Sequence, residues 1–521
     1  MTESTAERFR ALTPSEFFYR NRELAGFSNP VRALYQAVRE LVENALDATD
    51  SHMIKPTIKI IMRKEDEEGK IFSVSVEDNG IGIPPKNVPK AFGQLLYSSK
   101  YVLRQTRGMF GLGAKMAVLY GQMTTGKPVE VITSTILGKK IYFFQVAIDV
   151  KTNTPSIFRV GSYEKRDGWH GTSVKLYLEG DWVRSKSRIY DYLLRTAIIA
   201  PYAEIVFENP EGTVIYFERS TNRLPIPPRE VKPHPKGVDI EMLKMMLAVT
   251  KAKNVKKFLM SEFQNVGSVT ADKILARAGI SPTKPPSKIT AAEVEKLVKA
   301  IKEEKILPPR GDHLSFVGAE IIKTGLKAIL KPEFTEAVTR KPSVHGGHAF
   351  IVEAGIAYGG EISPSDKPVL FRYANKIPLL YDEGSDVSRK VVDRIDWGRY
   401  GVVFPAPLVV LVHICSTKIP YKGVGKESVA DVPEVEKEVE LAVREVARRL
   451  KRYLSRKRRE REEVEKAIAI AKYIPDVSRG LAKIVGNVNE DMIKKELLKM
   501  LNMRLKAFKI SSLEDIVLSI E

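Results

Sequence analysis

The clearest alternation of apolar and polar positions in the chain begins at Pro30. Apolar residues recur from there at three- and four-residue spacing, which predicts an amphipathic helix that starts at the proline: Val31, Leu34, Val38, Leu41, Ala45 and Leu46. Glu40, Asn44 and Asp47 form a separate polar stripe, which therefore faces one direction. A solvated face is the usual meaning of such a stripe, but asparagine is a mediocre helix former, so Asn44 suggests a different role.

Runs of β-branched and aromatic residues predict strands after this helix. They cover residues 57–62, 71–76, 129–134, 141–148, 174–178 and 204–207, with a further helix near 190–199. The second run leads to Asp78, Gly80 and Gly82, which predict a tight turn with a carboxylate at its mouth. Such a carboxylate can accept a hydrogen bond from the exocyclic amine of adenine. A plain Asn-Gly hairpin turn is the alternative, although the following Pro84-Pro85 disfavours a returning strand.

A glycine-rich run precedes an apolar helix expected over residues 114–120. The run consists of Gly108, Met109, Phe110, Gly111, Leu112, Gly113, Ala114 and Lys115. Glycines allow the backbone to approach an anion, and the start of a helix adds free N–H groups and a positive dipole end, so the run predicts a polyphosphate cradle. The nucleotide P-loop is excluded because Ala114 separates Gly113 from Lys115, and the Rossmann fingerprint is excluded by Met116. An ordinary flexible loop is the alternative for this run alone.

Four short motifs together resemble the GHKL ATPases. Glu40-x-x-x-Asn44, Asp78-x-Gly80-x-Gly82, the run 108–115 and Gly171-Thr172 occur in the order found in that superfamily. The sequences of residues 39–48 and 110–115 are similar to those of the B subunits of archaeal type IIB topoisomerases, the topoisomerase VI family. This similarity runs over nearly the whole chain.

The resemblance implies a role for each matching position. Asn44 would hold Mg²⁺ on the triphosphate of ATP, and Glu40 would be the general base, with Glu43 next in line. Asp78 and Thr172, shaped by Gly80 and Gly82, would read adenine. The phosphates would be held by Ser99, Lys100 and the eight residues 108–115. A transducer lysine would reach the γ-phosphate. The sequence around Lys426 makes it the preferred candidate, ahead of Lys418 and Lys422.

The resemblance also implies an α+β multidomain architecture. A GHKL-type α/β sandwich ATPase domain with an N-terminal strap is expected at 1–229, and a helix–two-turns–helix domain at 230–308. A transducer α/β domain with a long C-terminal stalk helix follows at 309–470, and residues 471–521 would dock on the A subunit of topoisomerase VI. Local sequence signals agree with these domain limits: the prolines at 225–235 indicate a boundary between domains. Within the expected helical domain, Gly279 indicates the end of a helix, and Thr290 with Glu293 indicates a capping box at the start of the next. β-rich segments predict strands at 349–357, 369–373 and 402–414. Apolar residues at helical spacing predict a long charged helix at 435–467 and further helix in the tail.

Composition narrows the possible partners. The formal net charge of +20 favours a polyanion such as double-stranded DNA, although a thermophile surface is also rich in charge. A single cysteine excludes internal disulfides and zinc clusters and indicates a reducing compartment. No run of about 18 apolar residues is present, so no membrane contact is expected. The expected location is cytoplasmic, on the nucleoid.

The resulting hypothesis is an ATP-driven DNA gate. Two copies would bind ATP, dimerise and trap a DNA segment, and hydrolysis would drive its passage through a break made by the A subunit in an A2B2 heterotetramer. The absence of an Asp-x-Asp pair agrees with cleavage by a separate polypeptide. An ATP-operated DNA clamp or scaffold without a topoisomerase role is the alternative. A histidine kinase is disfavoured because none of the seven histidines lies in a helical hairpin.

Overall fold

The computed structural model describes residues 11–98, 102–108, 111–423, 425–486 and 488–507. The chain divides into two compact units. The first contains residues 11–395 and 404–446, and the second contains residues 396–403 and 447–507, in each case within the described ranges. Two sheets, a helical insert and the start of a long helix make up the first unit.

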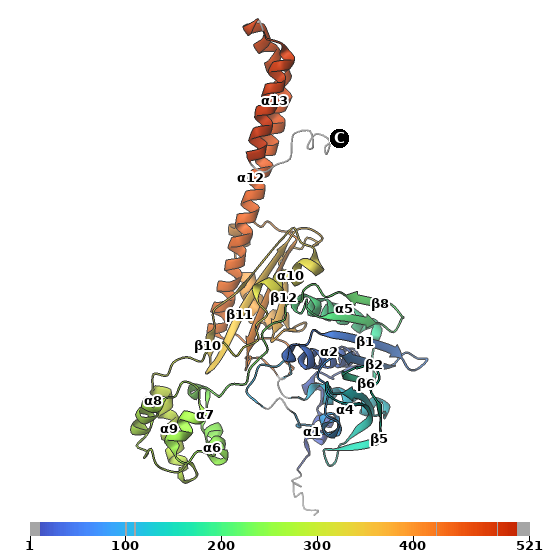
Figure 1. The fold of residues 1–521 in the computed structure, drawn as a ribbon, viewed down its shortest axis with the longest axis vertical. Coiled ribbons are helices and arrows are strands. Elements are labelled where there is room, and N and C mark those ends of the chain that lie inside the picture. Colours follow the sequence, from blue (N-terminus) through green and yellow to red (C-terminus); the bar gives the residue numbers. More distant parts are fainter. Residues whose placement is uncertain (1–10, 99–101, 109–110, 424, 487, 508–521) are drawn as a thin grey trace, which may run out of the picture. The chain divides into compact units, whose positions relative to one another are not determined.

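The first sheet has eight strands in the order β5-β4-β3-β6-β2-β1-β7-β8. Figure 1 labels β8, β1, β2, β6 and β5 of this sheet from top to bottom. Only β1 and β7 pair in parallel. Every strand predicted for this region is present, but β5 and β8, the two edge strands, had not been predicted. Side chains of β5 are exposed along most of its length, so its sequence has no inward-outward alternation. The strands are β1 (Thr57–Lys64), β2 (Ile71–Asp78), β3 (Val129–Ser134), β4 (Lys140–Asp149), β5 (Thr154–Glu164), β6 (Gly171–Glu179), β7 (Glu204–Glu208) and β8 (Val214–Phe217).

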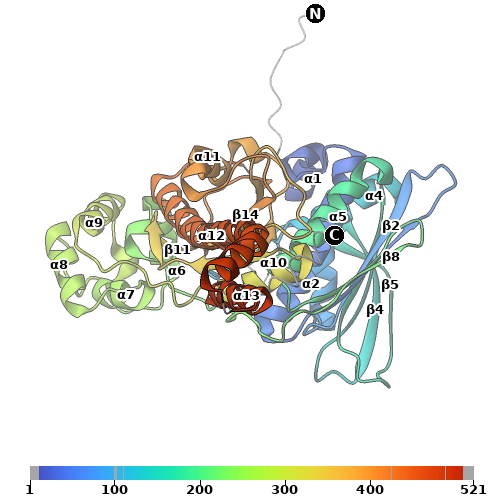
Figure 2. The same ribbon diagram turned by 90° about the horizontal axis from the view of Figure 1, so that it is seen from above.

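Helices α2 (Pro30–Thr49), α4 (Gly113–Thr125) and α5 (Trp182–Ile199) lie on the same side of this sheet (Figure 2). Helix α2 begins as expected: Pro30 takes the first helical position and Asn29 caps it, because its side chain accepts a hydrogen bond from the Arg32 N–H at 2.9 Å. The predicted apolar stripe of α2 is buried in the core below the sheet from Leu34 onward, whereas Val31 in the first turn is only partly buried, and the predicted α/β sandwich is confirmed.

The described part of the N-terminal arm packs on its own sheet in this single chain. It contains α1 (Pro14–Arg20) and the short η1 (Arg22–Ala25). The Thr13 hydroxyl donates to the Val150 carbonyl at 2.8 Å, and the Ser15 hydroxyl donates to Asn153 Oδ1 at 2.7 Å. A short helix α3 (Val88–Gly93) lies between β2 and the glycine-rich run in sequence.

The insert is a four-helix unit with its own apolar core. It contains α6 (Ile240–Val249), α7 (Val255–Glu262), α8 (Ser268–Ala278) and α9 (Ala291–Glu303). The predicted helix end and helix start in this insert are confirmed. Gly279 takes the left-handed conformation after α8, and Thr290 and Glu293 form a reciprocal capping box at the start of α9.

The second sheet has the strand order β10-β11-β14-β12-β13, and β9 also pairs with β11, on the edge opposite β14 that β10 shares. Helices α10 (Ala319–Leu330) and α11 (Val387–Arg394) accompany it. The predicted strand 402–414 is too long at its start: β14 begins at Leu408, since Pro405 and Pro407 cannot donate to a ladder. The strands are β9 (Phe334–Thr339), β10 (Ser343–His345), β11 (His348–Tyr358), β12 (Val369–Ala374), β13 (Ile377–Pro378) and β14 (Leu408–Ser416).

The predicted long helix, α12 (Pro433–Val485), extends 18 residues beyond the expected end at Ala467. Its first part belongs to the first unit, where Glu438 and Glu445 pair with Arg340. In the second unit it continues through Pro475 and packs against α13 (Glu490–Ala507) through an apolar cluster and an Arg504–Glu463 ion pair of 2.8 Å. None of the helices in the described ranges is long and apolar enough to cross a membrane.

Gly325 on α10 controls how closely this helix approaches α5. A Cβ added at Gly325 would lie 1.9 Å from the carbonyl oxygen of Ile198. We expect Gly325→Ala to lower the free energy of unfolding by about 1–3 kcal/mol, because the two helices must move apart. Urea denaturation is the measurement. Gly384→Ala is the matched control, since a Cβ at Gly384 would meet no atom within 4 Å; equal losses in the two variants would contradict the steric argument.

Candidate active site

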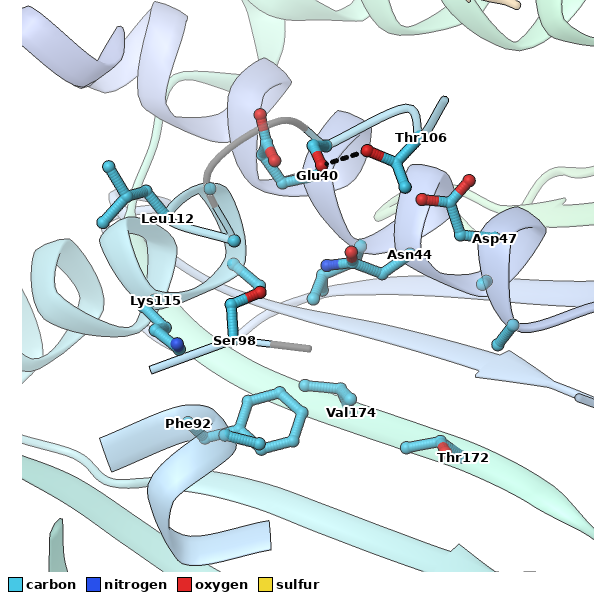
Figure 3. A pocket seen from close by; sticks show the side chains of 18 of the residues that line it. Glu40, Asn44, Asp47, Phe92, Ser98, Thr106, Leu112, Lys115, Thr172 and Val174 are labelled. Carbon is cyan, nitrogen blue, oxygen red and sulfur yellow. Dashed lines mark hydrogen bonds between the residues drawn. The ribbon is translucent and has the colours of Figure 1, made fainter. Parts of the chain in front are cut away.

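A cavity of about 620 Å³ opens between α2, α4 and the strands β2 and β6. Figure 3 shows Asn44 near its centre, Glu40 and Asp47 on neighbouring turns of the same helix, and Thr172 and Val174 on a strand at one side. The cavity is also lined by the turn after β2, by described residues of the glycine-rich run and of the segment before it, and by Gly425 and Lys426. The polar stripe predicted on α2 is therefore a cavity wall and not a solvated face.

The carboxylate of Glu40 is held at the start of α4. Gln36, one turn earlier on α2, donates from Nε2 to Glu40 Oε1 at 2.9 Å. A Cβ built on Gly113 would lie 1.5 Å from Glu40 Oε2, so only glycine allows this approach. Glu43 lies elsewhere: it is buried, does not line the cavity, and accepts from Arg39 Nε at 2.7 Å. Of the two glutamates considered as the general base, only Glu40 therefore lines the cavity.

At the other end of the cavity, Asp78 is buried at the end of β2. Its Oδ1 accepts from the backbone N–H groups of Gly80 at 2.8 Å and Thr172 at 3.3 Å. Burial raises the pKa of Asp78 to about 7, and these two hydrogen bonds only partly oppose that rise. The turn itself requires glycine at position 82, where φ is +70° and a Cβ would lie 2.1 Å from the Ser134 carbonyl oxygen.

The Thr172 side chain belongs to a small hydroxyl network beside Asp78. Its hydroxyl lies 3.2 Å from that of Thr133, which donates to the Gly171 carbonyl at 2.9 Å. Because Thr133 uses its only proton there, Thr172 donates its own to Thr133. The Thr133 oxygen also accepts from the Ile83 N–H at 2.9 Å, so the network ties β3 and β6 to the glycine turn.

Helix α4 begins inside the cavity wall, at Gly113. The residue before it, Leu112, has no side chain that could cap the first turn, so a ligand is free to interact with the dipole end there. Lys115 is buried on the first turn, and its ammonium donates to the Tyr97 carbonyl. The arrangement is that expected of a phosphate cradle.

Lys426 reaches the cavity from a loop of the second sheet. The loop is attached to α2 by an ion pair between Glu427 and Arg32. Lys422 points elsewhere, because its amino group bonds the Ser385 carbonyl at 2.5 Å and Asp431 at 3.2 Å. Neither Lys418 nor Lys422 lines the cavity.

Most of the predicted site residues come together in this cavity. Glu40, Asn44, Asp78, Gly82, Gly108, Gly111, Leu112, Gly113, Ala114, Lys115, Thr172 and Lys426 all line it, whereas Gly80 supports it through its bond to Asp78. Ser99, Lys100, Met109 and Phe110 lie outside the described residues. Gln36 had not been predicted, although its position four residues before Glu40 on the same helix face could have indicated it.

The class of protein follows from this site and from the fold. Residues 29–151 match the family model described as histidine kinase-, DNA gyrase B- and HSP90-like ATPase, and residues 309–466 match the transducer of the topoisomerase VI B subunit. The chain is therefore an ATPase of the GHKL class joined to a transducer domain.

Relatives identify the family within that class. The chain is 57% identical over 482 residues to the B subunit of type 2 DNA topoisomerase 6 from Sulfurisphaera tokodaii, a match that covers 92% of this chain and 91% of the relative. Proteins of the same name from Saccharolobus solfataricus and Metallosphaera sedula are 54% and 53% identical, and each match covers 94% of this chain and 93% of the relative. The chain belongs to the family of type 2 DNA topoisomerase 6 B subunits.

The raised pKa of Asp78 has a consequence for stability. Because the carboxyl ionises near pH 4 when unfolded and near pH 7 when folded, ionisation costs folding free energy as pH rises between these values. Asp78→Asn keeps the acceptor oxygen without the charge. Because the unfolded carboxyl is already mostly ionised at pH 5, we expect the variant to be more stable than the wild type by roughly 1–2 kcal/mol at pH 5 and by roughly 3–4 kcal/mol at pH 8, from about 1.4 kcal/mol per pKa unit. Urea denaturation at both pH values measures this, and a difference that does not change with pH would contradict it.

Proposed function

We propose that this chain is the ATP-driven gate of a type IIB topoisomerase. Two copies bind ATP, dimerise and capture a segment of double-stranded DNA. Hydrolysis and transducer movement are coupled to passage of that segment through a break made by the A subunit. This passage relaxes supercoils and decatenates DNA. The observation that carries the proposal is the convergence of Glu40, Lys426 and the start of α4 on one cavity.

Adenine would lie at the Asp78 end of the cavity. The backbone N–H groups of Gly80 and Thr172 both bind Oδ1, so Oδ2 is the natural acceptor for the exocyclic amine. A carboxylate acceptor requires the ionised form, which the pKa of about 7 makes available at neutral pH and above. Apolar lining residues such as Val76, Ile83 and Val174 suit the faces of the base.

The triphosphate would lie against the start of α4. The amides of its first turn, its dipole and Lys115 all favour negative charge at that point. Lys426 adds a second charge from the transducer loop, so a γ-phosphate would connect the two domains until it is lost. Loss of that contact on hydrolysis is a simple reason for the transducer to move.

Hydrolysis needs a group that accepts a proton from the attacking water. Glu40 is suited to this task because Gln36 orients its carboxylate and Gly113 allows it to lie beside the start of α4. Phosphoryl transfer depends mostly on positioning and on charge neutralisation, which the remaining cavity residues supply.

Magnesium fits the donor set only as an ion that arrives with the nucleotide. Within the described ranges no group of three or more His, Cys, Asp or Glu side chains could hold a metal. Mg²⁺ prefers few protein oxygens together with phosphate oxygens and water, and the amide oxygen of Asn44, which lines the cavity, would supply such a ligand. The bound ion would neutralise phosphate charge.

The remaining parts of the chain suit the partners in this proposal. A net charge of +20 favours DNA, and α13 with the end of α12 forms a helical hairpin that would dock on the A subunit. The N-terminal arm would be exchanged between two copies on dimerisation, and Phe18 of that arm already lines the cavity. A DNA clamp without topoisomerase activity would share the ATP site but would not need a cleaving partner.

Glu40→Gln tests the proposed base. We expect ATP hydrolysis to fall by roughly 10²–10⁴-fold, the usual contribution of a general base, while binding and dimerisation with a non-hydrolysable ATP analogue persist. Phosphate release and solution mass measure the two effects. Normal hydrolysis by the variant would move the base elsewhere, and failure of the wild type to bind ATP would overturn the site. Adding supercoiled DNA and the cleaving partner then separates the topoisomerase from the clamp.

Lys426→Met tests the transducer lysine against a matched neighbour. We expect the turnover rate to fall at least tenfold, because one charge in contact with a transferring phosphate contributes several kcal/mol. Lys422→Met in the same loop loses a partly exposed pair with Asp431 and an exposed hydrogen bond to the Ser385 carbonyl, both away from the cavity, so its turnover should stay within twofold of the wild type. Equal losses in the two variants would show that loop stability, not the Lys426 charge, is what matters.

A further inference from the structure

The turn between β12 and β13 has a conformation that its residues do not favour. Asn375 and Lys376 both have positive φ, at +49° and +69°. Hairpin turns with two left-handed residues favour asparagine first and glycine second, so lysine is the unexpected member. Its side chain is also buried, with 5% exposed. A strained position that carries a buried charge suggests that the side chain has a specific task.

The amino group of Lys376 contacts the ATPase domain. It lies 3.6 Å from Asp50 Oδ2, just past the end of α2 in that domain, and it also donates at 2.7 Å to the hydroxyl of Ser315, in the segment before α10. Asp50 is completely buried and also accepts from Arg107, at 3.0 and 2.7 Å, and from the Tyr202 hydroxyl at 2.8 Å. Although burial alone would raise the pKa of Asp50, the charges of Arg107 and Lys376 hold it below its usual range.

This contact lies directly before the glycine-rich run. Gln105 exchanges two hydrogen bonds with the Ser315 backbone, at 3.0 and 2.8 Å. The Thr106 carbonyl accepts from Asn375 Nδ2 at 3.3 Å, and Arg107 binds Asp50. Three consecutive residues, 105–107, are thus held by the turn or by groups that the turn contacts, and the next residue is Gly108.

The same turn is anchored to the second sheet. The Lys376 backbone N–H donates to His413 Nε2 at 3.0 Å, so the other ring nitrogen carries the proton and donates to Glu353 at 2.8 Å. Glu353 in turn accepts from the backbone N–H groups of Val317 and Gly318 at 2.8 and 2.7 Å. These bonds join β11, β14 and the segment before α10 to one side of the turn.

We propose that Lys376 is a positioning residue that holds residues 105–108 (the phosphate loop) through Asp50 and reports the loop's position to the transducer sheet. The inference rests on the proposed function. Lys376 would be a second connection between the ATPase domain and the transducer, in addition to Lys426. Lys426 lines the cavity, whereas Lys376 does not. Arg107 belongs to this loop, and its partner Asp50 also binds the turn. A shift at the loop therefore changes the bonds of the turn.

The test uses the full chain with three variants. Lys376→Met keeps the length of the side chain without its charge, and Lys376→Arg restores a charge. Lys331→Met is the matched control, because Lys331 also has positive φ, at +43°, but is exposed and pairs only at the surface with Glu361. Amide hydrogen exchange of residues 103–108 is measured without nucleotide, and kcat and KM for ATP are measured separately.

We expect Lys376→Met to speed exchange at residues 103–108 and to raise KM by roughly tenfold, with a smaller change in kcat, because the loop must then be ordered by the nucleotide. Lys376→Arg should recover most of the loss, and Lys331→Met should behave as the wild type. The proposal would be overturned if exchange at residues 103–108 is unchanged in Lys376→Met. It would also be overturned if kcat and the melting temperature fall and KM rises without faster exchange. If Lys376→Met does not fold, Ser315→Ala must show the faster exchange.

The two proposals fail in different ways. A wild type that neither binds nor hydrolyses ATP overturns the proposed function, yet the exchange measurement without nucleotide still decides whether Lys376 holds the loop. A wild type that hydrolyses ATP, together with variants whose exchange is unchanged, overturns only the role of Lys376.

Discussion

Burial of helix α2 is the constraint on which the rest of the structure depends. The helix is covered by the first sheet, by α4 and by α5, and its apolar residues are almost fully buried. Only the face with Glu40, Asn44 and Asp47 is turned to a cavity. A helix fixed on its other faces holds these polar groups in place without cost at the moment of reaction, which is the arrangement that electrostatic catalysis requires.

The ends of α2 connect the ATPase domain to the second sheet. Near its start, Arg32 pairs with Glu427, beside Lys426, and just past its end Asp50 pairs with Arg107 and Lys376. The Asp50 connection uses buried charges, which are sensitive to small movements because an unpaired charge inside a protein is costly, whereas the Arg32–Glu427 pair is partly exposed. Under the proposed function, a change in the nucleotide would have two physical routes from one helix to the transducer.

Asp78 illustrates how a binding site costs stability. Its carboxyl is buried with only two backbone donors, and burial raises its pKa to about 7. A neutral amide would suit the free protein better, whereas an ionised carboxylate suits a ligand that offers an amine. Local rules of stability are commonly broken at functional sites for this reason.

The sequence by itself determined the parts that depend on local periodicity and on short motifs. The apolar spacing of α2, the glycine turn after Asp78 and the capping box of α9 are local, because neighbours in sequence specify them. The family resemblance ranked Glu40 ahead of Glu43 and Lys426 ahead of the other two lysines, and the tertiary structure shows that these two side chains reach the cavity. The tertiary structure alone revealed the contacts of Lys376. Asp50 and Lys376 are separated by more than 300 positions, and no periodic pattern records such a pairing. The edge strands β5 and β8 escaped prediction for a related reason: few of their side chains are buried, so no core selects an alternating pattern.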